Sequence, residues 1–189
     1  MSSGRRRALW PPLVCLTAGV LACAVAPVLG AFEVLDASAE LRDGVYYLDA
    51  ELTYRLGTDP LEALENGVPL VLEIHVEVIE HHPWLPDETV ASLVQQFRLK
   101  YHSLTERYVV TNINSGERRS YTSRSEALQY AGAVRDLPII DRSLLDTSQS
   151  HGVRVRVRLD VESLPAPLRL WGYVSGDWRL TSPWLEIPL

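Results

Sequence analysis

The segment Ile74–Trp84, "IHVEVIEHHPW", concentrates histidine and glutamate, which can bind a metal ion or transfer protons. On a β-strand, His75 and His81 would lie roughly 20 Å apart, and His81 and His82 would point to opposite faces. Only His75 and Glu77 would be neighbours on one face. The segment therefore predicts a solvated outer strand face, with no metal and no cofactor. A histidine-based pH sensor is an alternative, because imidazole titrates near neutral pH.

Three arginines, Arg154, Arg156 and Arg158, alternate with apolar residues in "VRVRVRLDVE" and would form a ladder on one strand face. Such a ladder could clamp a phosphate or a carboxylate. The favoured interpretation is that it pairs with Glu73 and Glu77 on a neighbouring strand, because cross-strand ion pairs each contribute about 0.2–1 kcal/mol.

Aromatic residues gather near the C-terminus, where they could line a pocket or an interface. A core position is the favoured interpretation, because tryptophans of small β-domains usually pack inside or over the core. The arginine ladder and these aromatics are nevertheless the candidate interaction surface: Arg154, Arg156, Arg158, Trp171, Tyr173, Trp178 and Trp184.

Sequence signatures of catalysis are missing from the chain. It has no G-x-S-x-G, S-x-x-K, H-E-x-x-H, P-loop or G-x-G-x-x-G pattern. The sequence therefore favours a non-enzymatic protein, and no residue is assigned a catalytic role. A hydrolase without a recognisable motif would need a buried acid beside His75 or His102 in a cleft.

The N-terminal segment has the three parts of a secretory signal peptide. Arg5–Arg7 are basic, the run from Ala8 to Ala31 carries no charge, and it ends in small residues. We expect cleavage after Gly30 or Ala31, with residues 1–31 as the signal and residues 32–189 as a single exported domain. The run is also long enough for an uncleaved inner-membrane anchor. "VLAC", which ends at Cys23, gives a weaker lipoprotein alternative. All three interpretations place the domain in the periplasm.

Charge and cysteine content narrow the function of this domain. The segment contains three of the 18 basic residues and none of the 24 acidic ones, so residues 32–189 carry a net charge of −9. That balance disfavours binding to nucleic acid or anionic lipid headgroups. Both cysteines, Cys15 and Cys23, also precede the domain. Disulfides, thiolate metal sites and a cysteine nucleophile are therefore excluded from it.

Alternating apolar and polar residues dominate the rest of the chain and predict antiparallel strands. Asp43-Gly44 predicts a hairpin turn. Each of its two strands would place alternate apolar residues on one inward face. Ser123 predicts a helix cap, and Asp59 another. We expect two strands around Ser175–Asp177. The fold class is mainly β, an antiparallel sandwich of immunoglobulin-like general architecture with one or two short helices. The inward-facing series are Leu35, Ala37, Ala39 and Leu41, then Leu48, Ala50, Leu52, Tyr54 and Leu56, then Leu70, Leu72, Ile74, Val76 and Val78.

Several segments together resemble an uncharacterised proteobacterial family, domain of unknown function 4390. They are "GVPLVLEIHVEV", "LKYHSLTERYVV", "EALQYAGAVRDLPII", "RVRLDVESLPAPLRLW" and "SGDWRLTSPWLEIPL", and they cover essentially the whole exported part. The resemblance implies an exported or membrane-anchored protein, often encoded beside a membrane sensor histidine kinase, and it assigns no activity. "EHHPW" departs from the family pattern, which is richer in arginine and tryptophan there, so a histidine-based family mechanism is disfavoured.

These observations favour a periplasmic protein-interaction module. The expected partner is an envelope or membrane protein, which the resemblance narrows to a sensor histidine kinase. Contact with the membrane is expected only through an uncleaved N-terminal segment. The alternative is a module that binds a small molecule or a lipid between its sheets, in an apolar cavity of at least about 300 Å³.

Overall fold

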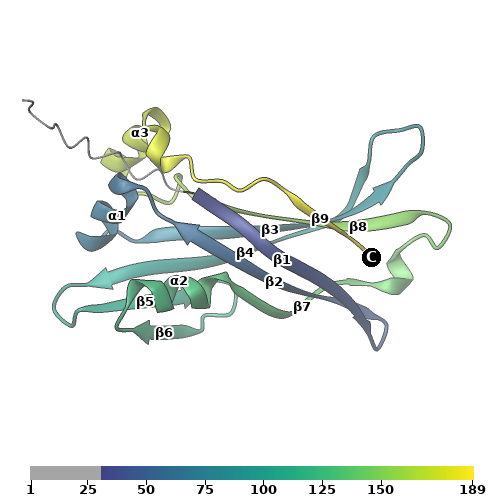
Figure 1. Ribbon diagram of the computed structural model, residues 1–189, viewed down its shortest axis with the longest axis horizontal. Helices are drawn as coiled ribbons and strands as arrows, with labels where there is room; N and C mark the ends of the chain where they lie inside the picture. The colour runs from purple at the N-terminus through teal and green to yellow at the C-terminus, as the bar shows by residue number, and fades with distance from the viewer. Residues whose placement is uncertain (1–30) are drawn as a thin grey trace, which may run out of the picture.

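The computed structural model describes residues 31–189, which form two antiparallel β-sheets packed face to face (Figure 1). The predicted signal or anchor segment lies outside the described residues except for Ala31. A three-stranded sheet has the order β1-β2-β7, and a six-stranded sheet has the order β6-β5-β4-β3-β8-β9. One hydrophobic core joins them, which confirms the mainly β sandwich. The strands are β1 Ala31–Arg42, β2 Val45–Arg55, β3 Leu70–His81, β4 Glu88–His102, β5 Arg107–Asn112, β6 Arg118–Tyr121, β7 Ala133–Asp141, β8 Ser150–Leu159 and β9 Leu185–Pro188.

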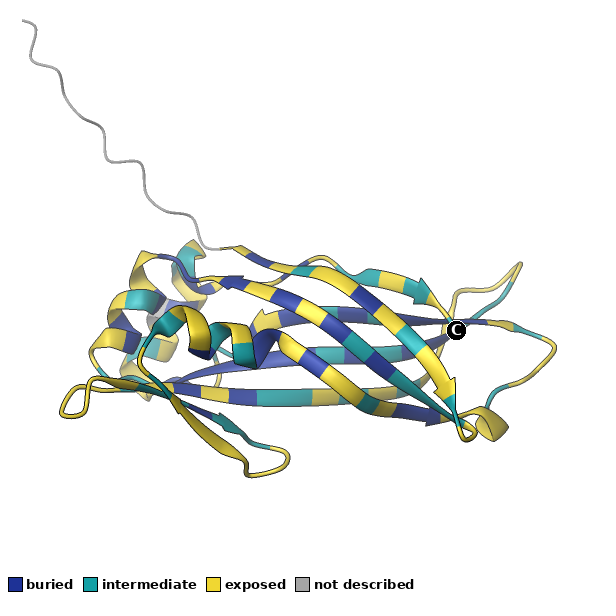
Figure 2. Ribbon diagram, turned by 60° about the horizontal axis from the view of Figure 1, so that its bottom comes forward, coloured by how far each residue is buried: buried dark blue, intermediate teal, exposed yellow. Residues whose placement is uncertain are grey.

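The hairpin between β1 and β2 turns at Asp43 and Gly44, as predicted. Both residues have positive φ angles, 51° and 86°, which the favoured two-residue hairpin turn requires. The inward series of β2 and of β3 are buried as expected. Figure 2 shows this alternation of buried and exposed positions along the long strands.

A β-bulge in β1 overturns part of the predicted alternation. The pairing register shifts between Val34 and Asp36, so Leu35 is the extra residue. Because a bulge moves later side chains to the other face, Phe32 and Ala37 both point into the core. Leu35 is exposed rather than buried. Leu41 was also expected inside, and it is exposed near the hairpin end.

Two of the helices occupy positions close to those predicted. They are α1 (Thr58–Glu65), which begins after Gly57 without the expected Asp59 cap, and α2 (Arg124–Gly132). Ser123 caps α2, since its Oγ accepts a hydrogen bond of 3.1 Å from the Glu126 amide. Within residues 31–189, no helix combines the length and the apolar character needed to span a bilayer.

We expect Ser123→Ala to lower the free energy of unfolding by about 1 kcal/mol, because one amide of the first turn of α2 loses its acceptor. Urea denaturation measures this loss. Ser120→Ala, on an exposed position of β6, is the control and should change stability by less than about 0.5 kcal/mol. Equal effects of the two substitutions would contradict the capping role.

The C-terminal region corrects one prediction. The chain forms α3 (Ala166–Val174) and a 3-10 turn, η2 (Gly176–Trp178), instead of two strands around Ser175–Asp177. The open edge of β8 is taken by the residues that follow, because Leu180 and Ser182 bond to its backbone and β9 continues the pairing. Residues 166–174 therefore cannot pair with this edge of β8.

Candidate functional site

Strand β2 extends past its neighbour β7 at one end of the three-stranded sheet. Its pairing with β7 ends at Glu51 opposite Ala133, whereas its pairing with β1 continues to Arg55. Helix α2 replaces β7 over this stretch, and the Tyr54 hydroxyl donates a hydrogen bond of 3.2 Å to the Ala131 carbonyl. Residues 52–55 of β2 are therefore paired with a strand on one side only.

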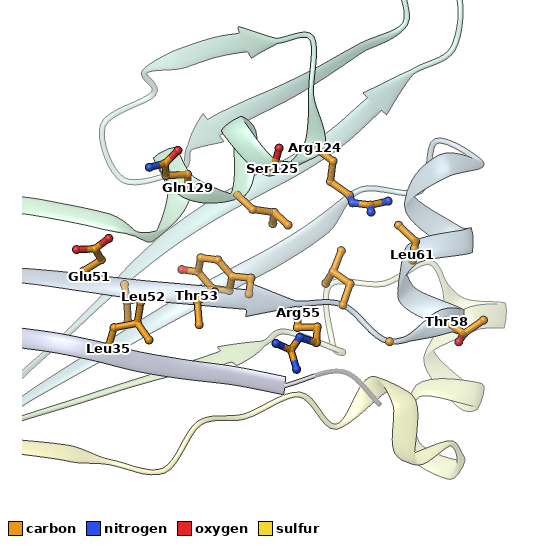
Figure 3. Close-up of a pocket in the computed structure, with 14 residues that line it drawn as sticks. Leu35, Glu51, Leu52, Thr53, Arg55, Thr58, Leu61, Arg124, Ser125 and Gln129 are labelled. Carbon is orange, nitrogen blue, oxygen red and sulfur yellow. The ribbon is translucent and has the colours of Figure 1, made fainter. Parts of the chain in front are cut away.

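A hollow with a volume of about 820 Å³ lies beside this one-sided stretch. We call it the β2 groove. Its walls are residues 51–58, Leu35, Leu61 of α1, and Arg124, Ser125, Leu128 and Gln129 of α2 (Figure 3). None of these residues belongs to the six-stranded sheet. The β2 groove is therefore at the edge of the sandwich, not in the predicted place between the sheets.

The β2 groove combines an apolar floor with cationic side chains. Leu52, Tyr54 and Leu56 supply buried apolar surface, and burial raises the pKa of the Tyr54 hydroxyl far above its usual value. Arg124 is held by an ion pair of 3.1 Å with Glu65. Arg55 is exposed at the end of β2. Glu51 also lines the groove, so the site suits an apolar chain whose negative charge lies near Arg55.

The arginine ladder pairs with the acids of β3, as expected. Arg158 lies opposite Glu73 and Arg154 opposite Glu77, with ion pairs of 2.6 and 3.6 Å. Arg156 lies opposite His75, and its guanidinium stands 4.3 Å from the centre of the Trp184 ring. The Arg154 guanidinium also lies 5.9 Å from this ring. The ladder is therefore held by its own sheet, through ion pairs and cation–π contacts with Trp184.

Glu73 is the central residue of this network, although the sequence placed it on a wet face. It is 6% exposed, and its carboxylate accepts hydrogen bonds from Arg158 Nε at 2.6 Å and Gln96 Nε2 at 2.8 Å. The His75 ring lies 3.0 Å away. Burial alone would raise the pKa of Glu73, but the hydrogen bonds from Gln96, Arg158 and His75 hold it below its ordinary value.

The candidate aromatics occupy different environments. Trp178 is 2% exposed and belongs to the core. Tyr173 is exposed on α3, and with Arg158 and Trp178 it lines a hollow of about 250 Å³. Trp184 covers the arginine ladder. Trp171 lies in α3, and its side chain is outside the described part of the structure.

Several histidines and acids share partners. His81 lies 3.2 Å from Asp87, and His151 lies 3.2 Å from Glu80. His81 has a second acidic neighbour in Glu186 at 3.4 Å, and Glu80 lies near both His82 and His151. In residues 31–189, no three His, Cys, Asp or Glu side chains converge on a point where a metal could bind. The hydrolase alternative required a buried acid beside His75, which Glu73 provides. Neither residue lines the β2 groove or the hollow at Tyr173.

Two exposed features escaped the sequence reasoning. The first is the β2 groove. The second is Trp84, which is 95% exposed in the loop between β3 and β4. Pro83 and Pro86, the two ends of "PWLP", stiffen this loop and prevent the strand from continuing. These prolines are the sequence signal that could have indicated an exposed loop here.

A comparison with protein families adds an independent result. The model of one family, described as a domain of unknown function (DUF4390), matches residues 30–188. No curated protein and no solved structure matches the chain. The match covers the whole described domain, and it agrees with the resemblance seen in the sequence. The chain therefore belongs to the DUF4390 family.

Proposed function

We propose that this domain is a periplasmic binding module that takes up an extended segment of an envelope or membrane protein in the β2 groove. The observation that carries the proposal is the one-sided stretch of β2, residues 52–55, beside a hollow of about 820 Å³. A strand edge next to a groove is the arrangement that proteins use to add a peptide to a sheet.

The backbone of β2 supports this mode of binding. A Cβ atom on Gly132 of α2 would overlap the carbonyl oxygen of Leu52, so this carbonyl points away from β1 and is covered by α2. Tyr54 is the next residue whose polar backbone groups could meet a peptide. Alternate residues of an antiparallel strand direct their polar backbone groups to the same side. The amide and carbonyl of Tyr54 therefore point the same way, toward the β2 groove.

The side chains of the β2 groove define the partner's chemistry. Side chains of an added strand alternate between the groove and solvent. Leucines such as Leu61 and Leu128 would receive its apolar residues, and Arg55 would attract an acidic residue at its end. The resemblance in the sequence suggests a membrane sensor histidine kinase as the protein that carries this segment.

Site-specific photocrosslinking in living cells tests the proposal. A photoreactive amino acid at Gln129, which lines the β2 groove, should capture one envelope protein. The same amino acid at Glu126, which is exposed on α2 outside the groove walls, is the control and should not. Ser125→Trp places an indole in the β2 groove and should abolish the product at Gln129.

Identical products from Gln129 and Glu126 would contradict binding in the β2 groove. So would a product that survives Ser125→Trp but disappears when Arg154 and Arg156 are both replaced by glutamate. That second result would place the partner on the arginine ladder, where the sequence analysis first located it.

The volume and lining of the β2 groove also favour a second candidate function, the uptake of a small amphiphilic acid. Its volume lies within the range of about 300–1,000 Å³ that is typical of ligand sites. Its apolar floor and Arg55 suit a hydrocarbon chain with a carboxylate. Native mass spectrometry of the purified protein should then show a bound molecule that Ser125→Trp removes.

A further inference from the structure

Helix α3 exposes large apolar side chains without any described residue to cover them. Leu170 is 73% exposed, Tyr173 is 52% exposed and Val174 is 78% exposed. Other positions hold the helix to the domain, since Gly172 packs against Val161 and η2 contacts both α3 and α1. The apolar side chains therefore stand on a fixed element.

The described chain begins at this same end of the domain. Ala31 pairs with Arg55, two residues before Gly57, which lies beside Asp177 of η2. The Ser175 hydroxyl lies 3.3 Å from Asp59 of α1. Figure 1 shows the start of β1 next to α1 and α3, with the hairpin between β1 and β2 at the opposite end.

No linker separates β1 from the uncharged N-terminal run. The run ends at Ala31, which is the first residue of β1. From Ala8 onward it exceeds the roughly 20 residues that span a bilayer and the roughly 7–15 apolar residues of a signal peptide. If it stayed in the membrane, the end that carries α3 would lie within a few residues of the lipid headgroups.

We propose that the run before β1 remains as a membrane anchor and that α3 rests on the bilayer surface. Leu170 and Val174 then enter the boundary between headgroups and acyl chains, and Tyr173 lies at headgroup depth, where its amphipathic ring is favoured. The contact is apolar, so it does not depend on anionic lipids and is compatible with the acidic domain. This proposal is independent of the β2 groove.

Fluorescent labelling of the full-length protein in phosphatidylcholine vesicles tests the contact. Cys15→Ser and Cys23→Ser remove both native cysteines, and Val174→Cys then takes one polarity-sensitive dye. Leu144→Cys is the matched control, because Leu144 is 69% exposed and lies beyond β7, at the other end of the sandwich. We expect the dye at position 174 to emit at shorter wavelength and to be quenched by headgroup nitroxide lipids. The control should show neither effect.

Three outcomes would overturn the proposal. Equal quenching at both positions, or none at position 174, would show that α3 does not face the bilayer. A wavelength shift that persists in detergent and grows with protein concentration would show that a second copy covers α3. If the protein extracted from the membrane has the mass of a chain that starts at Ala31 or Phe32, the run is cleaved and does not anchor the chain.

Discussion

Replacing Gly132 with alanine should destabilise the domain by about 3 kcal/mol, which corresponds to a fall of about 6–12 °C in melting temperature. Gly132 ends α2, where it passes directly over β2. Its added methyl group would overlap the Leu52 carbonyl and press on the Tyr54 ring. Both belong to the buried part of β2, so neither can move without displacing the core. Thermal unfolding followed by circular dichroism measures the change.

Gly176→Ala is the matched control for this substitution. Neither glycine has a positive φ angle, and a Cβ at Gly176 meets no atom within 4 Å. The free energy of unfolding of the Gly176→Ala protein should stay unchanged or rise slightly, because alanine restricts the unfolded chain. A Gly132→Ala protein as stable as this control would show that α2 is not packed against the β2 backbone. The position of α2 as a wall of the β2 groove would then also be contradicted.

Replacing Glu73 with glutamine should lower the free energy of unfolding at neutral pH by about 2 kcal/mol. The hydrogen bonds from Arg158 and Gln96 hold the pKa of Glu73 below its unfolded value. The charged carboxylate therefore stabilises the fold above about pH 4.5, and this stabilisation is lost as pH falls through the lower folded pKa. Urea denaturation from pH 7 to pH 3 measures it.

Glu77→Gln is the control for Glu73→Gln. Its ion pair with Arg154 is longer, at 3.6 Å, and its carboxylate is more exposed than that of Glu73, so Glu77→Gln should lower the free energy of unfolding by less than about 1 kcal/mol. Wild type and Glu73→Gln should approach the same free energy of unfolding at low pH. A difference between wild type and Glu73→Gln that stays constant with pH would show that the charge of Glu73 is not what stabilises the outer face.

The alternation of apolar and polar residues along the chain is sufficient to predict which side chains of β2 and β3 face the core. In β2 and β3 every second residue is apolar, and those residues form the core. The pairing of Arg158 with Glu73 was also foreseeable, because both strands carry complementary charges at the same period. Such patterns repeat over many residues, so one exception does not hide them.

The parts that escaped prediction depend on long-range competition. Leu35 continues the alternation of β1 in sequence, but the bulge reverses its face. Residues 166–174 form a helix, and it is later residues that occupy the edge of β8. The β2 groove exists because β7 leaves β2 at Glu51, and this departure depends on contacts between residues more than 80 positions apart. Periodicity contains no information about such a departure.

The length of β3 fixes the separation between the two ends of the sandwich. Its 12 residues extend over about 40 Å at 3.3 Å per residue, and it is hydrogen-bonded to β4 on one side and to β8 on the other. Trp84 follows its far end, while α1 and α3 lie at its start. If α3 marks the bilayer surface, a protein that contacts Trp84 is held at a constant height of roughly 40 Å above the lipid. The domain would then set a fixed distance between the membrane and whatever binds at Trp84.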